Sequence, residues 1–304
     1  DDDTTPGDDD TTAADDDDAT AGDDDDSSAE PPMEFMFSFA ILADPHVTSS
    51  GDNEARLIAA VDWINAVAEQ RQVELVLVLG DVAWHGGLDI IVGVLDELDM
   101  PFAALIGDNE VQAGDEEAFD VTFTPTYEAL STDFENWSKT IAPVYNPLAD
   151  QDNWFSNFSF EHRGVHFVAV DWCARGAFGA LSEVGDLHDF EDGTFQWFTD
   201  DLAAMDVTAA DSVIMASHIP MHLGLLDLDE LAQVEALLLQ YEDQVYAQFA
   251  GHVHVDAEHE VGEDLYTVYV TDAVFDDELR VRVVEVSGNG ERFAYEHELV
   301  DVPY

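Results

Sequence analysis

Residues with the chemistry of metal ligands follow five apolar runs of this sequence. FSFAILA is followed by Asp-Pro-His, VELVLVL by Gly-Asp, FAALI by Gly-Asp-Asn-Glu, SVIMA by Ser-His-Ile-Pro and VYAQFA by Gly-His-Val-His. Oxygen and imidazole nitrogen ligands suit manganese, iron and zinc, and these segments contain no cysteine to select a softer metal. The residues concerned are Asp44, His46, Asp81, Asp108, Asn109, His218, His252 and His254.

Each segment also has a simpler interpretation when it is taken alone. Asp-Pro-His and Gly-Asp are common in turns, and an isolated His218 is more often a hydrogen-bonded polar residue than a ligand. Gly-His-Val-His is more specific, because alternate residues of an extended chain point to the same side. Chance would have to place ligand-type residues after all five runs, so we predict that they form one site for two divalent metal ions.

The apolar runs are typical of buried β-strands, and they determine where the polar residues meet. In open α/β sheets, ligands bind in the crevice beyond the carboxyl ends of the strands. Polar residues that follow several strands therefore come together at one edge. We predict strands at residues 35–43, 73–79, 101–106, 165–171, 212–217, 245–250, 265–271, 279–286 and 292–299.

Helical periodicity occurs between several of these strands, at residues 53–70, 194–204 and 229–241. Strand, helix and strand in succession imply parallel pairing with right-handed crossovers, whereas the C-terminal third consists of consecutive strands. We therefore predict mixed sheets with helices outside, in a single domain at residues 33–304, and we expect a monomer. The apolar residues predicted to share one helix face are Ala55, Ile58, Ala59, Ile64 and Val67 in the first helix, and Leu231, Val234, Leu237 and Leu238 in the third.

The chain is strongly acidic. Of its 304 residues, 69 are acidic and 8 are basic, so its formal net charge at pH 7 is −61. Such a surface repels nucleic acid backbones and anionic membranes, so we expect no nucleic-acid partner. Because salt screens the repulsion between like charges, the composition predicts a halophilic protein. The single cysteine, Cys173, excludes an intrachain disulfide, and no run reaches the roughly 18 apolar residues of a membrane-spanning helix.

Residues 1–32 are a degenerate repeat of aspartate runs separated by small residues and threonine. Because this segment has few apolar side chains and strong charge repulsion, we predict a disordered acidic spacer. Calcium binding by the aspartate runs is less favoured, since the glycine-turned spacing of a calcium loop is missing. The segment resembles the spacers that follow the lipidated cysteine of some bacterial surface lipoproteins. That resemblance implies an extracytoplasmic protein, either secreted or held at a membrane only by an N-terminal lipid anchor.

The five polar segments in order, DPH, GD, GDNE, SHIP and GHVH, resemble the motifs of the calcineurin-like metallophosphoesterase superfamily. The usual pattern of that family is D-x-H, G-D, G-N-H-D/E, H and G-H-x-H. The stretches FSFEHRGVHFVAVD (158–171) and GTFQWFTDDLAA (193–204) are also similar to segments between the family's motifs. The resemblance covers residues 35–300 and implies a four-layer αββα sandwich, in which two mixed β-sheets are flanked by helices.

The function that this resemblance implies is hydrolysis of phosphate monoesters or diesters by attack of a hydroxide bound to two metal ions. The substrate would be a phosphorylated small molecule or macromolecule, and the two divalent ions would be manganese, iron or zinc. By the resemblance, Asp44, His46 and His254 hold one ion, Asp108, His218 and His252 hold the other, and Asp81 bridges both.

The third segment departs from the family's pattern at two positions. Asp108 replaces the metal-binding asparagine, and Asn109 replaces the histidine that assists substrate binding and protonates the leaving oxygen. Asparagine cannot act as a general acid, although its amide can donate a hydrogen bond to phosphate. The spacing from Gly107 favours Asp108 as the ligand, and a register with Asn109 as the ligand stays open. Glu110 is expected to order a neighbouring group or to cap the next segment.

Three further residues bear on the chemistry. His85 and His222 follow the second and fourth segments on loops that should face the site, so each is a candidate for the missing general acid. A solvent-exposed loop histidine is the simpler interpretation of both. Trp84 stands where purple acid phosphatases have a tyrosine ligand, so that related branch fits less well. The alternative function is a catalytically weak surface protein that keeps the fold and the metals and works by binding.

Overall fold

The structure is a computed structural model that describes all residues except 1–30, 85, 176–183 and 223. Most of the predicted N-terminal spacer and the candidate acid His85 therefore lie outside the described residues. Residues 33–304 form one compact unit, and the architecture below is that of this unit.

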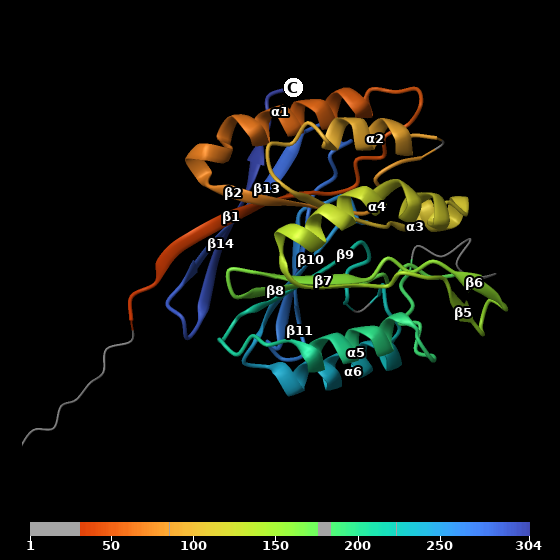
Figure 1. Ribbon diagram of the computed structural model, residues 1–304, viewed down its shortest axis with the longest axis vertical. Coiled ribbons are helices and arrows are strands. Elements are labelled where there is room, and N and C mark those ends of the chain that lie inside the picture. The colour runs from red at the N-terminus through yellow and green to blue at the C-terminus, as the bar shows by residue number, and fades with distance from the viewer. Residues whose placement is uncertain (1–30, 85, 176–183, 223) are drawn as a thin grey trace, which may run out of the picture. The chain divides into compact units, whose positions relative to one another are not determined.

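The first of two large mixed β-sheets carries the strands that precede the first three polar segments (Figure 1). Its strands are β1 (Glu34–Leu42), β2 (Val73–Leu79), β3 (Phe102–Leu105), β13 (Arg280–Gly288) and β14 (Phe293–Asp301). Their order in the sheet is β14-β13-β1-β2-β3. β1, β2 and β3 are parallel, so their carboxyl ends lie at one edge, and β13 and β14 run antiparallel beside them.

The second large sheet carries the strands that precede the two histidine segments. Its strands are β4 (Glu135–Lys139), β7 (Phe158–His162), β8 (Val165–Ala169), β9 (Val213–Ser217), β10 (Val245–Ala250), β11 (Ala257–Val261) and β12 (Tyr266–Val270). Their order is β11-β12-β10-β9-β8-β7-β4, and the four central strands from β12 to β8 are parallel. A separate antiparallel pair consists of β5 (Val144–Asn146) and β6 (Gln151–Asn153).

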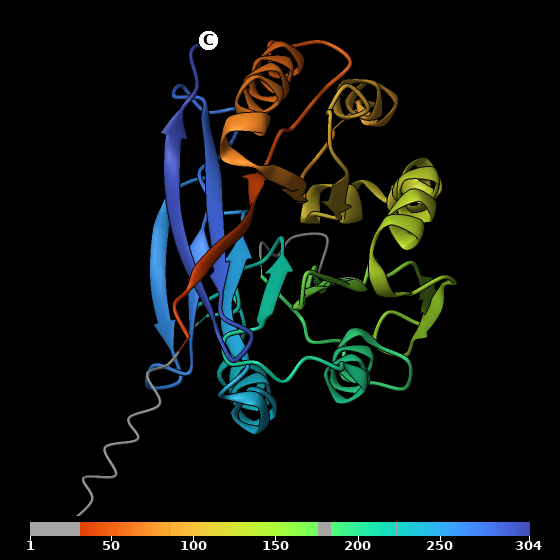
Figure 2. The same cartoon turned by 60° about the vertical axis from the view of Figure 1, so that its left-hand side comes forward.

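Helices cover the outer faces of both sheets, which completes the predicted four layers (Figure 2). The helices are α1 (Asn53–Arg71), α2 (Leu88–Leu95), α3 (Asp108–Ala113), α4 (Glu116–Asp133), α5 (Thr194–Ala204) and α6 (Leu228–Leu238), with the short 3-10 helix η2 (Leu239–Tyr241). α1 and α2 lie outside the five-stranded sheet, and α5 and α6 lie outside the seven-stranded sheet. In the part of the chain that is described, no helix has the length and apolar content to span a bilayer.

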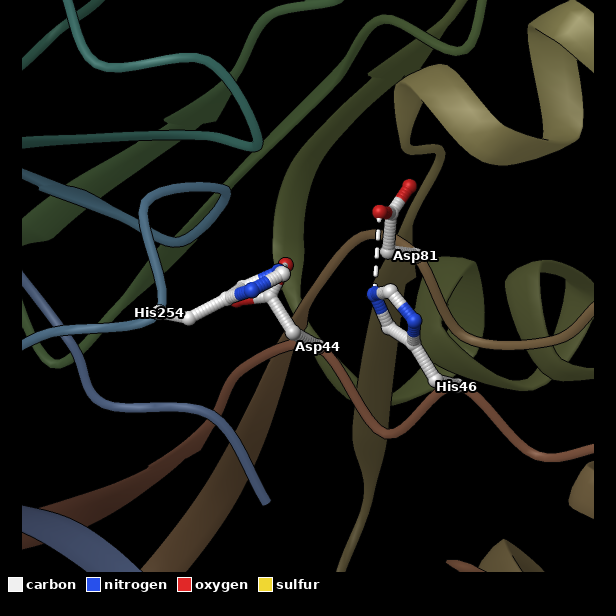
Figure 3. Close-up of side chains that lie close together, drawn as sticks. All are labelled: Asp44, His46, Asp81 and His254. Carbon is white, nitrogen blue, oxygen red and sulfur yellow. Dashed lines mark ion pairs between the residues drawn. The ribbon is translucent and has the colours of Figure 1, made fainter. Parts of the chain in front are cut away.

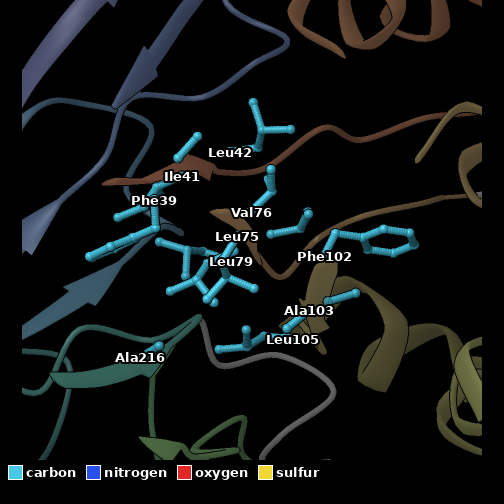
Figure 4. Close-up of a cluster of buried hydrophobic side chains, with 14 of the residues drawn as sticks. Phe39, Ile41, Leu42, Leu75, Val76, Leu79, Phe102, Ala103, Leu105 and Ala216 are labelled. Atoms are coloured by element: carbon cyan, nitrogen blue, oxygen red, sulfur yellow. The ribbon is translucent and has the colours of Figure 1, made fainter. Parts of the chain in front are cut away.

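Aromatic rings pack the two sheets against each other. Phe39 on β1 meets Phe167 on β8 edge to face, with ring centroids 5.4 Å apart, and meets Phe249 on β10 at 5.8 Å. Aliphatic side chains of β1, β2 and β3 extend this buried layer (Figure 4). Because close-packed aromatic contacts of this kind leave little freedom, strands from both sheets end at fixed relative positions.

The nine predicted strands are all present, with ends shifted by about two residues at most, and the three predicted helices are also confirmed. The predicted face of α1 is wrong except at Ile64. Its buried residues are Leu57, Ala60, Val61 and Ile64, a stripe spaced at three and four residues, whereas Ile58 is 41% exposed. Small alanines on several sides of this helix blur its apolar periodicity, so contact with the sheet determines which side is buried.

Candidate metal centre

Strands of both sheets end at the candidate metal centre, and hydrogen bonds donated by main-chain N–H groups tie their ends together. The N–H of His46, after β1, donates to the carbonyl of Asp81, after β2, at 2.9 Å. The N–H of His252, after β10, donates to both carboxylate oxygens of Asp44 at 3.0 Å, which joins one sheet to the other. The polar residues that follow these strands are therefore brought to one edge, as the sequence predicts.

The first group of candidate ligands consists of Asp44, His46, Asp81 and His254 (Figure 3). One ligand atom from each lies within 4.8 Å of all the others. Nε2 of His46 is 3.1 Å from Oδ2 of Asp81, and Nε2 of His254 is 3.5 Å from Oδ1 of Asp44. Both carboxylates are buried and the two histidines are partly exposed, so the group is open to solvent on its histidine side.

The second group consists of Asp108, His218 and His252, whose ligand atoms also lie within 4.8 Å of one another. Nε2 of His218 is 2.9 Å from Oδ1 of Asp108, and Nδ1 of His252 is 3.2 Å from the same oxygen. Ions held about 2.0–2.2 Å from oxygen and nitrogen ligands fit groups of this size. Each group could therefore hold one divalent ion.

Asp81 connects the two groups through its two oxygens. Oδ2 faces His46 of the first group at 3.1 Å, while Oδ1 faces Nε2 of His218 in the second group at 3.4 Å. The backbone N–H and side-chain amide of Asn109 donate to Oδ1 and Oδ2 at 2.9 and 2.7 Å, which fixes the plane of the carboxylate. A carboxylate held this way can bind a different ion with each oxygen.

The backbone is unusual at most of the candidate ligands. Five of the seven have φ between 46° and 71°, in the left-handed region. Residues other than glycine rarely adopt this region, and persist there only where the surroundings enforce it, typically at functional sites. The five residues are Asp44, His46, Asp81, His252 and His254.

Glycines before the ligands allow the close approach of neighbouring segments. A Cβ on Gly80, which has a φ of 77°, would lie 2.6 Å from the ring of His218. A Cβ on Gly107 would lie 2.1 Å from the backbone nitrogen of Asp81. Each of these two glycines is thus required, because a side chain at its position would collide with a residue that follows another strand.

Hydrogen bonds orient the ligands of the second group. Nδ1 of His218 donates to the carbonyl of Leu79 at 2.9 Å, which leaves Nε2 available for an ion. The side chain of Gln112 donates to Oδ2 of Asp108 at 2.6 Å. The sequence analysis missed Gln112. Had α3 been predicted to start at Asp108, the spacing of four residues would have placed the two on one helix face.

Glu110 binds two backbone segments. One of these bonds caps the start of the next segment, which was one of the roles expected for Glu110. Its Oε2 accepts from the N–H of Gly107 at 2.8 Å at the start of α3, and its Oε1 accepts from the N–H of Ala83 at 2.8 Å. Burial, reinforced by the nearby carboxylate of Asp81, raises the pKa of Glu110 to about 8. The GDNE segment is therefore a helix start and not an isolated turn.

The charges of the second group show what the site requires. Burial lowers the pKa of His218, but the carboxylates of Asp81, Asp44 and Asp108 outweigh burial and hold this pKa well above its usual value. Burial raises the pKa of Asp108, but His218 and His252 outweigh it and hold this pKa well below its usual range. Buried carboxylates at this density need cations beside them, and divalent ions would supply that charge.

Asn109 and His222 lie in different environments. Asn109 contacts Asp81, and its Nδ2 is 3.4 Å from Nε2 of His46. His222 belongs to neither of the two groups, and its ring stacks on His259 of β11 with centroids 4.1 Å apart. That His222 faces the site as an acid stays a prediction.

Two aromatic residues lie beside the first group. The ring of Phe275 is 4.5 Å from the ring of His46 and 4.8 Å from that of His254, between centroids. The ring of Trp84 is 6.2 Å from that of His46. Phe275 and Trp84 are both partly exposed. The sequence analysis did not single out Phe275, because no pattern around it differs from that of an ordinary loop.

A family model for calcineurin-like phosphoesterases matches residues 37–256. Among solved structures, a 5′-nucleotidase from Candida albicans aligns with a TM-score of 0.51 and 16% identity, over 90% of this chain and 53% of its own. A protein from Staphylococcus aureus assigned as a 5′-nucleotidase, in complex with alpha-ketoglutarate, aligns with a TM-score of 0.51 and 15% identity, over 88% and 54%. This chain thus spans about half the length of both, and the likeness shows the fold. No curated protein sequence matches it.

Proposed function

The chain belongs to the calcineurin-like phosphoesterase family, and from this premise we propose that it hydrolyses phosphate esters with two bound divalent metal ions. The observation that carries the proposal is the position of Asp81, whose Oδ2 faces the first group of ligands and whose Oδ1 faces the second. A shared carboxylate keeps two ions about 3.5–4 Å apart, the separation typical of two-metal phosphoesterase sites.

In this proposal, each group of ligands holds one ion and Asp81 contributes to both. Asp108 takes the ligand position in the second group, because its Oδ1 lies within 3.2 Å of both histidine nitrogens. Asn109 is turned toward Asp81 and His46. The register with Asp108 as the ligand therefore has the better geometry.

Bound ions would supply an activated water nucleophile and neutralise the charge of the phosphoryl oxygens. The chain's own residues orient these ions, because His218 is fixed by Leu79, Asp108 by Gln112, and Asp81 by Asn109. The Asn109 amide can also donate to a phosphoryl oxygen, but it has no proton to transfer to the leaving group.

The substitution at Asn109 favours one alternative function. Without a general acid, which usually contributes about 10²–10⁴-fold to the rate, the chain could retain both ions and act mainly as a binding protein. The ligand geometry is equally compatible with this alternative, so turnover has to be measured to distinguish the two.

The test combines metal analysis with assays on aryl phosphate mono- and diesters. We expect purified protein to bind two divalent ions, and Asp81→Asn to lose metal and at least about 10²-fold in turnover, since it weakens both sites at once. Asp62→Asn, which removes an exposed carboxylate on α1, is the matched control and should leave both unchanged. Two ions without turnover would support the binding protein, and protein that binds no ions would contradict the site.

A further inference from the structure

Every lysine and arginine of this chain lies in the described residues, and each is already engaged by a group other than the candidate ligands. Seven of the eight form ion pairs with carboxylates, and Arg56 donates to the carbonyl of Asp276. Arg175 is buried against Asp171 and Glu116. Across the described residues, which include all eight, none is paired with any of the seven candidate ligands.

Because the lysine and arginine side chains already have partners, they limit which substrates the site can recognise. Phosphate and carboxylate groups outside the reacting centre are usually bound by arginine or lysine. Here two metal ions would neutralise one phosphoryl group, and a second anionic group would meet a chain with a formal net charge of −61. Substrates with additional negative charge are therefore repelled by the surrounding carboxylates.

The apolar contacts available beside the ions are aromatic. Phe275 lies against both His46 and His254, and Trp84 lies near His46, while both rings keep part of their surface exposed. Rings of this kind stack on planar apolar groups and bury them efficiently. An aromatic group attached to a phosphoryl group at the first ion would be within reach of these rings.

The chemistry of Asn109 favours the same substrates. In the hydrolysis, a water oxygen forms the new bond to phosphorus, the bond from phosphorus to the ester oxygen breaks, and that oxygen leaves with the electron pair. An aryloxide can leave with this charge and take its proton from solvent, whereas an alkoxide needs a proton from an acid. The residue at this position cannot supply that proton.

We propose that the site selects esters with a single phosphoryl group on an otherwise uncharged aromatic alcohol, with Phe275 and Trp84 contacting the ring. This inference rests on the phosphoesterase function proposed above. Polyanionic substrates, such as nucleoside triphosphates and inorganic pyrophosphate, are disfavoured, because carboxylates neutralise seven of the eight basic side chains and the eighth, Arg56, is bound to the carbonyl of Asp276.

The first test compares two aryl phosphates that differ in charge and little in leaving group. We expect the metal-loaded protein to have at least about tenfold higher kcat/KM for 4-methylphenyl phosphate than for 4-(carboxymethyl)phenyl phosphate at low ionic strength. Because the discrimination is electrostatic, it should shrink as sodium chloride is added. Equal values for the two esters at low salt would overturn the exclusion of charge.

The second test addresses the rings. We expect Phe275→Leu to raise KM about three- to tenfold for phenyl phosphate and to leave KM for cyclohexyl phosphate nearly unchanged. Phe35→Leu, which alters an aromatic residue 43% exposed on β1, is the matched control. The metal content of each variant is measured in parallel. If the Phe275→Leu protein loses its ions, the Trp84→Leu protein is tested in its place.

The outcomes separate this inference from the function on which it rests. Metal-dependent turnover with no preference for uncharged aryl esters, and with KM unchanged in both aromatic variants, would overturn the inference and leave the phosphoesterase function standing. Absence of turnover on every ester, in protein that binds no ions, would overturn both.

Discussion

At the scale of single residues, Asn109 has an orienting role that its position in the sequence did not reveal. Its backbone N–H and side-chain amide both donate to the carboxylate of Asp81. The residue that replaces an acid therefore fixes the carboxylate shared by the two groups.

Restoring the acid should change the preference for leaving groups. We expect Asn109→His to raise turnover of alkyl phosphates by about tenfold or more relative to aryl phosphates, because poor leaving groups gain most from protonation. The measurement is kcat for phenyl and cyclohexyl phosphate in wild type and variant. Asn109→Gln keeps an amide and is the control. An unchanged aryl to alkyl ratio in Asn109→His would show that the missing acid does not determine the preference.

The choice between Asp108 and Asn109 as ligand can be made by counting ions. We expect Asp108→Ala to lose one of two bound ions, or to weaken its binding by at least about tenfold, since it removes an oxygen held by two histidines. Asn109→Ala should retain both ions. Metal titration followed by mass spectrometry measures this, and the reverse result would assign Asn109 as the ligand.

At the scale of elements, the site depends on how tightly strand ends approach one another. Gly107 ends the β3 segment and precedes α3, and it lies against the backbone of Asp81 after β2. Glu110, in the first turn of α3, then ties Gly107 to Ala83. The short helix α3 thus clamps two neighbouring strand ends, and a side chain at Gly107 would force them apart.

A pair of glycine substitutions tests this clamp. We expect Gly107→Ala to destabilise the fold by about 2–4 kcal/mol and to weaken metal binding, because its Cβ would displace Asp81. Gly93→Ala in α2 has open space around the new Cβ and should be neutral or stabilise by about 0.5–1 kcal/mol. Urea unfolding of the metal-loaded proteins measures both, and equal stabilities would contradict the close approach.

At the scale of the whole molecule, the acidic composition and the few cations act together. Lys139 and Arg175 are buried against acidic partners and connect α4 to other elements, and Arg282 is buried beside Asp256 after the last histidine segment. The few basic residues therefore stabilise contacts between elements. Only the solvent and its ions screen the repulsion among the remaining acidic groups.

Salt should therefore stabilise this protein. We expect the melting temperature to rise by several degrees as sodium chloride increases from about 0.1 M to about 1 M, because the screening length falls from roughly 10 to 3 Å. Differential scanning calorimetry of the metal-loaded protein measures the rise. Sucrose at equal osmolality stabilises only by exclusion from the surface and is the control. A melting temperature independent of salt would contradict the halophilic prediction.

Local patterns in the sequence predicted mixed sheets with helices outside and ligand-type residues after five strands, whereas the family resemblance implied the four layers and the role of each residue. Apolar runs of strand length identify β1, β2, β3, β9 and β10. The polar residues that follow each run lie where the chain leaves the sheet. The short or polar elements α3 and β4 were missed, because their side chains carry no periodic signal. The helices α2 and α4 were also missed, although α4 buries Phe119, Phe123, Tyr127 and Leu130 at helical spacing. The buried face of α1 was missed because contact with a sheet determines it.

The sequence by itself determined which ligand types are present and that they follow strands, since both are properties of adjacent residues. Only the tertiary structure decided that Asp81 offers one oxygen to each group, that Glu110 joins two strand ends, and that Phe275 lies against His46 and His254. These relations depend on distances between segments far apart in the chain, as in the hydrogen bond from His252 to Asp44. Packing of the two sheets sets such distances, and no short stretch of sequence contains them.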